Sequence, residues 1–206
     1  MDTIWAGLNH TVISKKEWFV RKIPTSKNKL SFEQAKASSL FYKRVIPDFV
    51  PKTRVMEIQW NSYLIVQQRI HWKTLSETWN DELSVHTLQS LLVFIEAIQD
   101  ILIHQWVQTD LVGRREGDEL PSVQMRKMCI WPFNSMYLFF RLIDIFKSSN
   151  IIVDNKGKIW FIDNIWDIAF PDGSIIQRTY KDIYYWNSLY FLYKYNISQI
   201  LKKRAK

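Results

Sequence analysis

Short apolar runs separated by polar turns dominate residues 1–70 and indicate β-strands. Thr11–Ser14 and Trp18–Ile23 lie on either side of a polar turn at 15–17, which predicts a β-hairpin. Strand character returns over residues 53–70, where Tyr63–Val66 is the most apolar run. We therefore expect two pairs of strands in this part of the chain, within a small sheet of the five-stranded type.

A helix is expected between the two strand pairs. Ser31 has the residue type that caps a helix N-terminus, and the helical pattern runs to about Val45, ahead of Pro47. The predicted order of elements over residues 1–70 is accordingly β-β-α-β-β.

The remainder of the chain is mainly helical in pattern. Residues 82–107 and 180–203 predict helices, residues 108–122 predict a loop, and residues 123–148 predict partly helical structure. Polar residues interrupt the apolar stretch Leu91–Val107, so we interpret it as an amphipathic helix and not as a membrane span.

A second hairpin signal lies at residues 150–163. Ile151–Val153 and Ile159–Ile162 flank an Asp154–Gly157 turn. Asn150 precedes the first run and Asp163 ends the second, so a hairpin would bring an amide oxygen and a carboxylate together. Hard divalent cations such as magnesium prefer oxygen ligands of this kind. The alternative is an ordinary hairpin that happens to have Asn and Asp at its ends.

The hairpin and the order of elements resemble the protein-kinase-like fold, and most closely its branch of aminoglycoside and choline phosphotransferases. The resemblance implies an α+β fold with two lobes and ATP and magnesium bound between them. The N-lobe would be a small antiparallel β-rich lobe at residues 1–70, and the C-lobe a reduced, mainly helical lobe at residues 71–206. In this family an Asn after the catalytic loop and an Asp after the hairpin hold magnesium on the ATP phosphates, which implies that role for Asn150 and Asp163.

The same resemblance implies three cofactor-binding residues in the N-lobe. Lys22 would bind the ATP phosphates, Glu33 would pair with Lys22, and Gly7 stands where a glycine-rich phosphate loop would be. Alternation along the strand places Val20 and Lys22 on one face, with Arg21 on the other as the rival for the phosphate role. A surface lysine on an edge strand is the alternative for Lys22.

The catalytic base is where the chain departs from the family. Ile145 stands at the position of the usual aspartate, and Asp144 lies one residue further from Asn150. A one-residue bulge would restore Asp144 as the base, whereas its absence would make the protein a pseudokinase. Lys147 could neutralise charge on the transferred phosphate, and Asp110 is another possible acid. Asn164 replaces the phenylalanine that usually follows the metal-binding aspartate.

The amino-acid composition indicates a folded domain without disulfides or a zinc site. The 206 residues are 47% hydrophobic with only five glycines and six prolines, which indicates a folded domain with a sizeable core. The single cysteine, Cys129, offers neither an intramolecular disulfide nor a zinc framework. No signal peptide is recognised at the N-terminus, so the cytoplasm is the expected location.

The net charge of +8 suits a phosphorylated ligand, a nucleic acid or an anionic surface. Three functions follow. The first is an atypical ATP-dependent kinase that phosphorylates a small molecule or a protein. The second is a catalytically inactive pseudokinase that binds nucleotide as a scaffold or regulator. The third, which lacks a recognised motif, is a basic module that stacks nucleic-acid bases on exposed aromatic residues.

Overall fold

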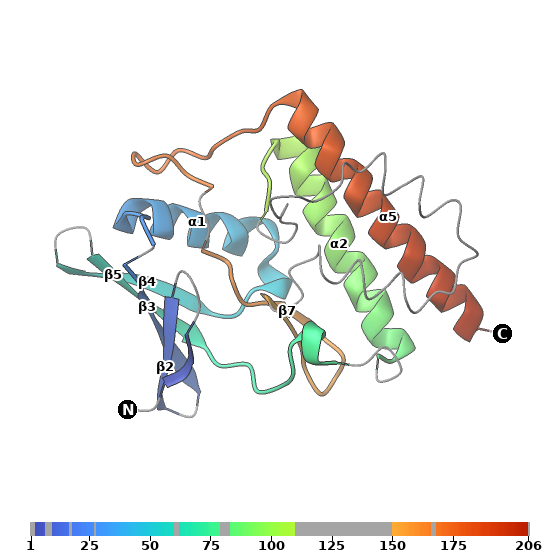
Figure 1. Ribbon diagram of the computed structural model, residues 1–206, viewed down its shortest axis with the longest axis horizontal. Coiled ribbons are helices and arrows are strands. Elements are labelled where there is room, and N and C mark those ends of the chain that lie inside the picture. Colours follow the sequence, from blue (N-terminus) through green and yellow to red (C-terminus); the bar gives the residue numbers. More distant parts are fainter. Residues whose placement is uncertain are drawn as a thin grey trace. The chain divides into compact units, whose positions relative to one another are not determined.

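The computed structural model describes residues 3–6, 10–16, 18–26, 28–59, 62–78, 83–109, 150–165 and 168–205. Its strands are β1 Thr3–Ala6, β2 His10–Lys16, β3 Phe19–Pro24, β4 Thr53–Gln59, β5 Ser62–Gln68, β6 Ile151–Val153 and β7 Ile159–Phe161. Its helices are α1 Phe32–Val45, α2 Val85–Gln105 and α5 Tyr180–Arg204, with short 3-10 turns at Pro47–Phe49 and Leu75–Glu77. Figure 1 labels the three helices and strands β2, β3, β4, β5 and β7.

The chain divides into two compact units. The first contains Met1–His71 and Trp160–Ile176, and the second contains Trp72–Ile159 and Gln177–Lys206. The first division lies one residue from the predicted lobe boundary at 70/71. Residues 160–176, which were assigned to the C-lobe from the sequence, belong instead to the first unit, because they pack against its sheet and helix.

A five-stranded antiparallel sheet forms the body of the first unit. The strand order is β1-β2-β3-β5-β4, and α1 connects β3 to β4. The helix lies against β4 in the sheet (Figure 1). The α+β class and the predicted β-β-α-β-β order are therefore confirmed, with β1 as an additional strand at the edge.

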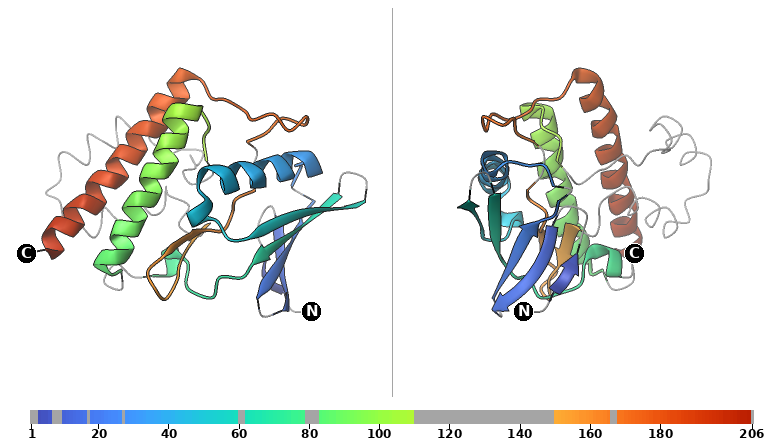
Figure 2. Two further views of the ribbon diagram at one scale, coloured as in Figure 1. Left: turned by 180° about the vertical axis from the view of Figure 1, so that it is seen from behind. Right: turned by 60° about the vertical axis from the view of Figure 1, so that its left-hand side comes forward.

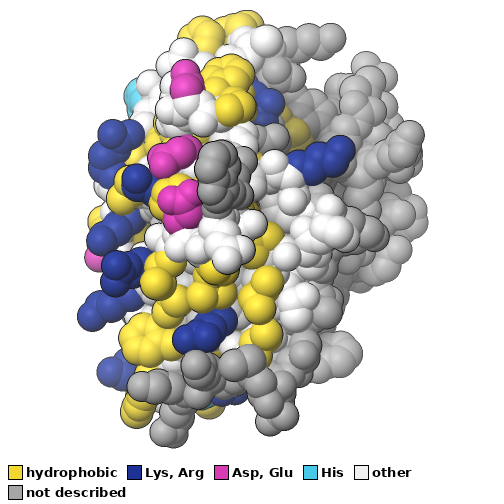
Figure 3. Space-filling view, turned by 90° about the vertical axis from the view of Figure 1, so that its left-hand side faces the viewer, with side chains coloured by type: hydrophobic (Ala, Val, Ile, Leu, Met, Phe, Trp, Pro, Cys, Tyr) yellow, Lys and Arg dark blue, Asp and Glu magenta, His cyan; other side chains and the backbone are white. Residues whose placement is uncertain are grey.

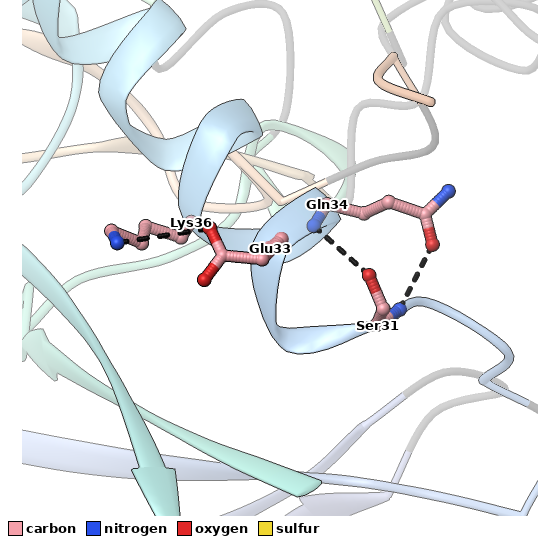
Figure 4. Close-up of polar contacts among 4 residues, drawn as sticks. All are labelled: Ser31, Glu33, Gln34 and Lys36. Carbon is pink, nitrogen blue, oxygen red and sulfur yellow. Dashed lines mark hydrogen bonds and ion pairs between the residues drawn. The ribbon is translucent and has the colours of Figure 1, made fainter. Parts of the chain in front are cut away.

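Helix α1 begins where its capping signal predicts. The Ser31 hydroxyl accepts a hydrogen bond from the Gln34 N–H, and the Gln34 side chain accepts one from the Ser31 N–H (Figure 4). This reciprocal capping box satisfies two main-chain donors that the first turn leaves without helical partners. Sequence-local chemistry thus sets the start of the helix.

The sheet buries one face and exposes the other. The buried face forms a core with α1 and the 160–176 segment around Ala35, Tyr63, Ile65 and Ile165. Tyr42 of α1 also meets Phe161 of β7 edge-to-face, with ring centroids 5.4 Å apart. The exposed face retains apolar side chains such as Phe19, Ile23, Met56 and Ile58. On the side of the molecule drawn in Figure 3, Lys and Arg side chains gather along one edge with hydrophobic side chains beside them.

Helices α2 and α5 pack side by side in the second unit, as both views in Figure 2 show. Polar contacts join them within this packing: Gln99 donates to Asn187 at 2.6 Å, and the hydroxyls of Thr109 and Tyr190 lie 3.1 Å apart. By length and composition α2 is apolar enough to cross a membrane, yet half of its apolar window is buried inside the protein. The burial of Leu91, Ile95 and Ile98 on one side agrees with the predicted amphipathic core helix.

The β6–β7 hairpin forms as predicted, and its turn is attached to the start of α2. Gly157 has φ +76°, a backbone conformation that favours glycine, and a Cβ at this position would lie 2.7 Å from the Thr87 hydroxyl. The Asp154 carboxylate accepts hydrogen bonds from the N–H groups of Lys156 and Lys158, which closes the turn.

Candidate functional site

Strand β3 places Lys22 inside the first unit. Val20 and Lys22 are buried while Phe19 and Ile23 are exposed, which confirms the alternation expected from the sequence. The Lys22 side chain is only 8% exposed, and its ammonium donates a 2.6 Å hydrogen bond to the main-chain oxygen of Ile162. This bond connects the strand to the residue immediately before Asp163.

Asp163 lies close enough to act on Lys22 electrostatically. Burial lowers the pKa of Lys22, because water no longer solvates the ammonium, and the Asp163 carboxylate partly opposes this by raising the same pKa. Within the described residues, the half-buried Asp163 carboxylate makes no hydrogen bond or ion pair of its own. The site therefore combines a buried cation with a nearby carboxylate that is available to a ligand.

Among the described residues, the buried side chain of Lys22 makes a single hydrogen bond, fewer than it has donors for. Lysine has three N–H donors, and one of those of Lys22 is used by Ile162. The two that remain, in a site with little water, suit an anion with several acceptor oxygens, such as a phosphate.

The residue after Asp163 fixes the segment to the sheet. Asn164 is 2% exposed; its side-chain oxygen accepts a 3.1 Å hydrogen bond from Gln67 of β5, and its main-chain oxygen accepts one from Ser38 of α1. These hydrogen bonds of Asn164 to Gln67 and Ser38 hold the segment that contains Asp163 against the sheet and α1.

Three further polar residues lie near Asp163, and the sequence pattern did not mark them as site residues. His10 of β2 and Tyr63 of β5 both hydrogen-bond to the side chain of Asn28, at 3.1 and 3.0 Å. The period-2 alternation of β5, where Tyr63, Ile65 and Gln67 are buried, could have placed Tyr63 on the same face as Lys22. Sequence gave no signal for the position of Asn28, which lies in a loop.

The electrostatics of these residues depend on burial. Burial lowers the pKa of His10 to about 4; Asp163 acts to raise that pKa and Lys22 to lower it further. Burial raises the pKa of Tyr63 to about 12; the Asn28 hydrogen bond acts to lower that pKa and Asp163 to raise it. His10 and Tyr63 are therefore neutral at pH 7 beside Lys22 and Asp163.

Glu33 lies elsewhere. It is exposed in the first turn of α1 and pairs with Lys36 at 3.7 Å, as Figure 4 shows. In the part of the chain that the structure describes, Lys22 bonds to Ile162 and Glu33 pairs with Lys36, so the structure does not bring Glu33 to Lys22. The position of Glu33 is explained by the helix dipole, which favours an acidic residue in a first turn.

The other predicted site residues lie in the second unit or outside the described residues. Asn150 directly precedes β6 in the second unit, whereas Asp163 follows β7 in the first, so their shared role as magnesium ligands stays a prediction. Gly7, Asp110, Asp144 and Lys147 lie outside the described residues.

The described residues do not bring several metal-binding side chains together. No three His, Cys, Asp or Glu side chains gather into a metal-binding group among the described residues. Magnesium is often held by one or two carboxylates together with water and substrate phosphates. Asp163 is the carboxylate available for this role in the first unit.

Comparison with known proteins gives structural likeness alone. No family model matches the chain, and no curated protein matches it. Among solved structures, the choline kinase LicA from Streptococcus pneumoniae is similar with a TM-score of 0.41 and 12% identity, covering 97% of this chain and 91% of that one. The GDP and kanamycin complex of APH(2")-IIia is similar with a TM-score of 0.40 and 11% identity, covering 99% and 86%.

Proposed function

We propose that this protein is an atypical kinase-like phosphotransferase that binds ATP and magnesium through Lys22 and Asp163. The observation that carries the proposal is the buried Lys22 ammonium bonded to Ile162, the residue before Asp163. The family resemblance implies that a strand lysine binds the ATP phosphates and that the aspartate after the hairpin holds magnesium on them. Buried positive charge next to an available carboxylate suits a phosphate chain that carries a hard cation.

Each residue has a distinct part in this proposal. Lys22 binds phosphate oxygens with the two N–H donors that Ile162 leaves available. Asp163 and Asn150 supply oxygen ligands to magnesium, which when bound neutralises charge on the phosphates. The Ile162 and Asn164 bonds orient Asp163 by fixing the residues on both sides of it.

Transfer itself depends on the acceptor side of the site. The acceptor hydroxyl forms a bond to the terminal phosphorus, the bond from that phosphorus to the bridging oxygen breaks, and the hydroxyl proton passes to a base. Asp144 is the candidate base. The pseudokinase alternative is favoured by Ile145 at the usual base position, and it predicts ATP binding without phosphotransfer to small-molecule or protein acceptors.

The test of nucleotide binding is thermal unfolding with ATP, in the presence and absence of magnesium. A ligand that binds the folded state raises the melting temperature. We expect ATP with magnesium to stabilise the wild-type protein, and Asp163→Asn to lose the magnesium-dependent part. Asp172→Asn is the matched control, because Asp172 lies in the same segment but, among the described residues, bonds to Ser174 in an exposed turn. Absence of any stabilisation of the wild type by ATP contradicts the proposal.

A further inference from the structure

His10 lies on the same face of the sheet as Lys22. In the β2–β3 pairing His10 is opposite Pro24 and Val12 is opposite Lys22, and alternate residues of a strand point to the same side. His10 is 5% exposed, and both Asp163 and Lys22 act on it electrostatically. The histidine therefore belongs to the environment of the Lys22–Asp163 site.

The hydrogen bonds of Asn28 determine which nitrogen of His10 carries the proton. The Asn28 side-chain oxygen accepts a 2.9 Å hydrogen bond from the Leu30 N–H, so the other end of the amide is the NH₂ group. That group donates to the Tyr63 hydroxyl at 3.0 Å and lies 3.1 Å from Nε2 of His10. A donor facing Nε2 requires Nε2 to be the acceptor, which puts the proton of the neutral ring on Nδ1.

The Nδ1–H group has no partner within the described part of the chain. Nε2 bonds to Asn28, and no second hydrogen bond of the ring exists among the described residues. A ring N–H that no protein group uses is available to a ligand or to water. Because the ring is neutral at pH 7, it can donate to an anion without itself adding a buried positive charge to the site.

We propose that His10 is a ligand-binding residue of this site, whose Nδ1–H donates a hydrogen bond to a phosphate oxygen of the anion held by Lys22. The identity of that anion as a nucleotide phosphate rests on the proposed function, whereas the donor role of His10 rests on its hydrogen bonds. Asn28 and Tyr63 act through His10: their contacts hold the ring in the tautomer that presents Nδ1–H to the ligand.

Two substitutions separate this role from a structural one. In His10→Gln the glutamine amide group lies about as many bonds from Cβ as Nε2 does in histidine. Its oxygen can therefore accept the hydrogen bond from Asn28, but the donor at the position of Nδ1 is lost. In His10→Asn the asparagine side-chain nitrogen lies as many bonds from Cβ as Nδ1 does in histidine. The donor to the ligand is therefore kept, but the shorter side chain loses the bond to Asn28. A ligand-binding role predicts weaker binding in the Gln variant, and a structural role predicts the greater loss in the Asn variant.

Isothermal titration with MgATP and, separately, with sodium pyrophosphate measures the effect. We expect His10→Gln to bind MgATP roughly ten- to a hundredfold more weakly than wild type, the range for losing a hydrogen bond to a charged group. His10→Asn keeps a donor at the position of Nδ1 and should lose less affinity than His10→Gln. Equal affinity of His10→Gln and wild type, or a greater loss in His10→Asn, overturns the role of His10 and leaves nucleotide binding intact.

The pyrophosphate titration separates the two proposals. If the wild type binds pyrophosphate but not ATP, the nucleotide proposal fails and the same pair of variants decides the role of His10 on pyrophosphate. If it binds neither, both proposals fail. Nitrogen NMR of the wild-type histidines gives a test that needs no variant: a proton on Nδ1 of His10 supports the proposal, and a proton on Nε2 overturns it.

Discussion

The Lys22 ammonium donates a hydrogen bond to the main-chain oxygen of Ile162, and the two residues lie 140 positions apart in the sequence. The bond holds Asp163 near a lysine on the buried face of the β-sheet. The hydrophobic core formed by Ile165 with Ala35, Tyr63 and Ile65 supports the same arrangement, because it attaches the segment to the sheet on the other side of Asp163.

Replacement of Lys22 by methionine should weaken ATP binding without unfolding the protein. Loss of the ammonium removes charge-assisted hydrogen bonds, so affinity measured by titration should fall by at least about tenfold. Stability in urea should change little or increase, because an apolar side chain replaces a buried charge. Arg21→Met is the matched control on the opposite face of the strand. If Arg21→Met loses affinity and Lys22→Met does not, Arg21 is the phosphate-binding residue.

Mild acid should destabilise the protein through His10. Its pKa is 6.5 when unfolded and about 4 when folded, so between these values the unfolded state binds a proton that the folded state does not. The contribution is fully present above pH 6.5 and is lost as the pH falls toward 4. Between pH 7 and pH 5 this amounts to about 2 kcal/mol. Asp163 and Lys22 are the charged groups that act on the ring.

Urea unfolding of the ligand-free protein in EDTA at pH 7 and pH 5 measures this contribution. The difference in unfolding free energy between the two pH values should be smaller in His10→Gln, which cannot titrate. An equal loss of stability in wild type and His10→Gln shows that other groups cause the acid sensitivity.

Removal of the Asn164 side chain should destabilise the first unit. In Asn164→Ala the buried amide of Gln67 loses its hydrogen bond to Asn164 but keeps the one to Thr53, and the loss of one hydrogen bond costs about 0.5–1.5 kcal/mol. Chemical denaturation measures the change, with Asn155→Ala in the exposed turn as control. A cost as small as that of the control contradicts the assignment of Asn164 as the anchor of this segment.

The two described glycines with positive φ should respond differently to alanine. Both pay a backbone cost of about 1 kcal/mol, but a Cβ at Gly157 would also lie 2.7 Å from the Thr87 hydroxyl, whereas at Gly173 the nearest atom is at 3.8 Å. Gly157→Ala should therefore lower the free energy of unfolding by more than Gly173→Ala in thermal or urea unfolding. Equal effects contradict the close packing of the hairpin turn on α2.

Much of the fold follows from local sequence patterns. The alternation in β3 and β5, the capping residues Ser31 and Gln34, and the turn at Asp154–Gly157 act over a few residues, so the sequence alone determines these elements. The same local patterns placed Lys22 on the buried face and Asp163 at the end of a hairpin.

Only the tertiary structure decided which of these residues meet. Glu33 follows the local preference of a helix start and pairs with Lys36, while Lys22 bonds to Ile162. The assignment of residues 160–176 to the first unit depends on hydrogen bonds and core contacts with β5 and α1, which are distant in sequence. The tautomer of His10 likewise depends on Asn28, a loop residue positioned by Leu30 and Tyr63. Such pairings arise from long-range packing and from satisfying buried polar groups, which no pattern over neighbouring residues specifies.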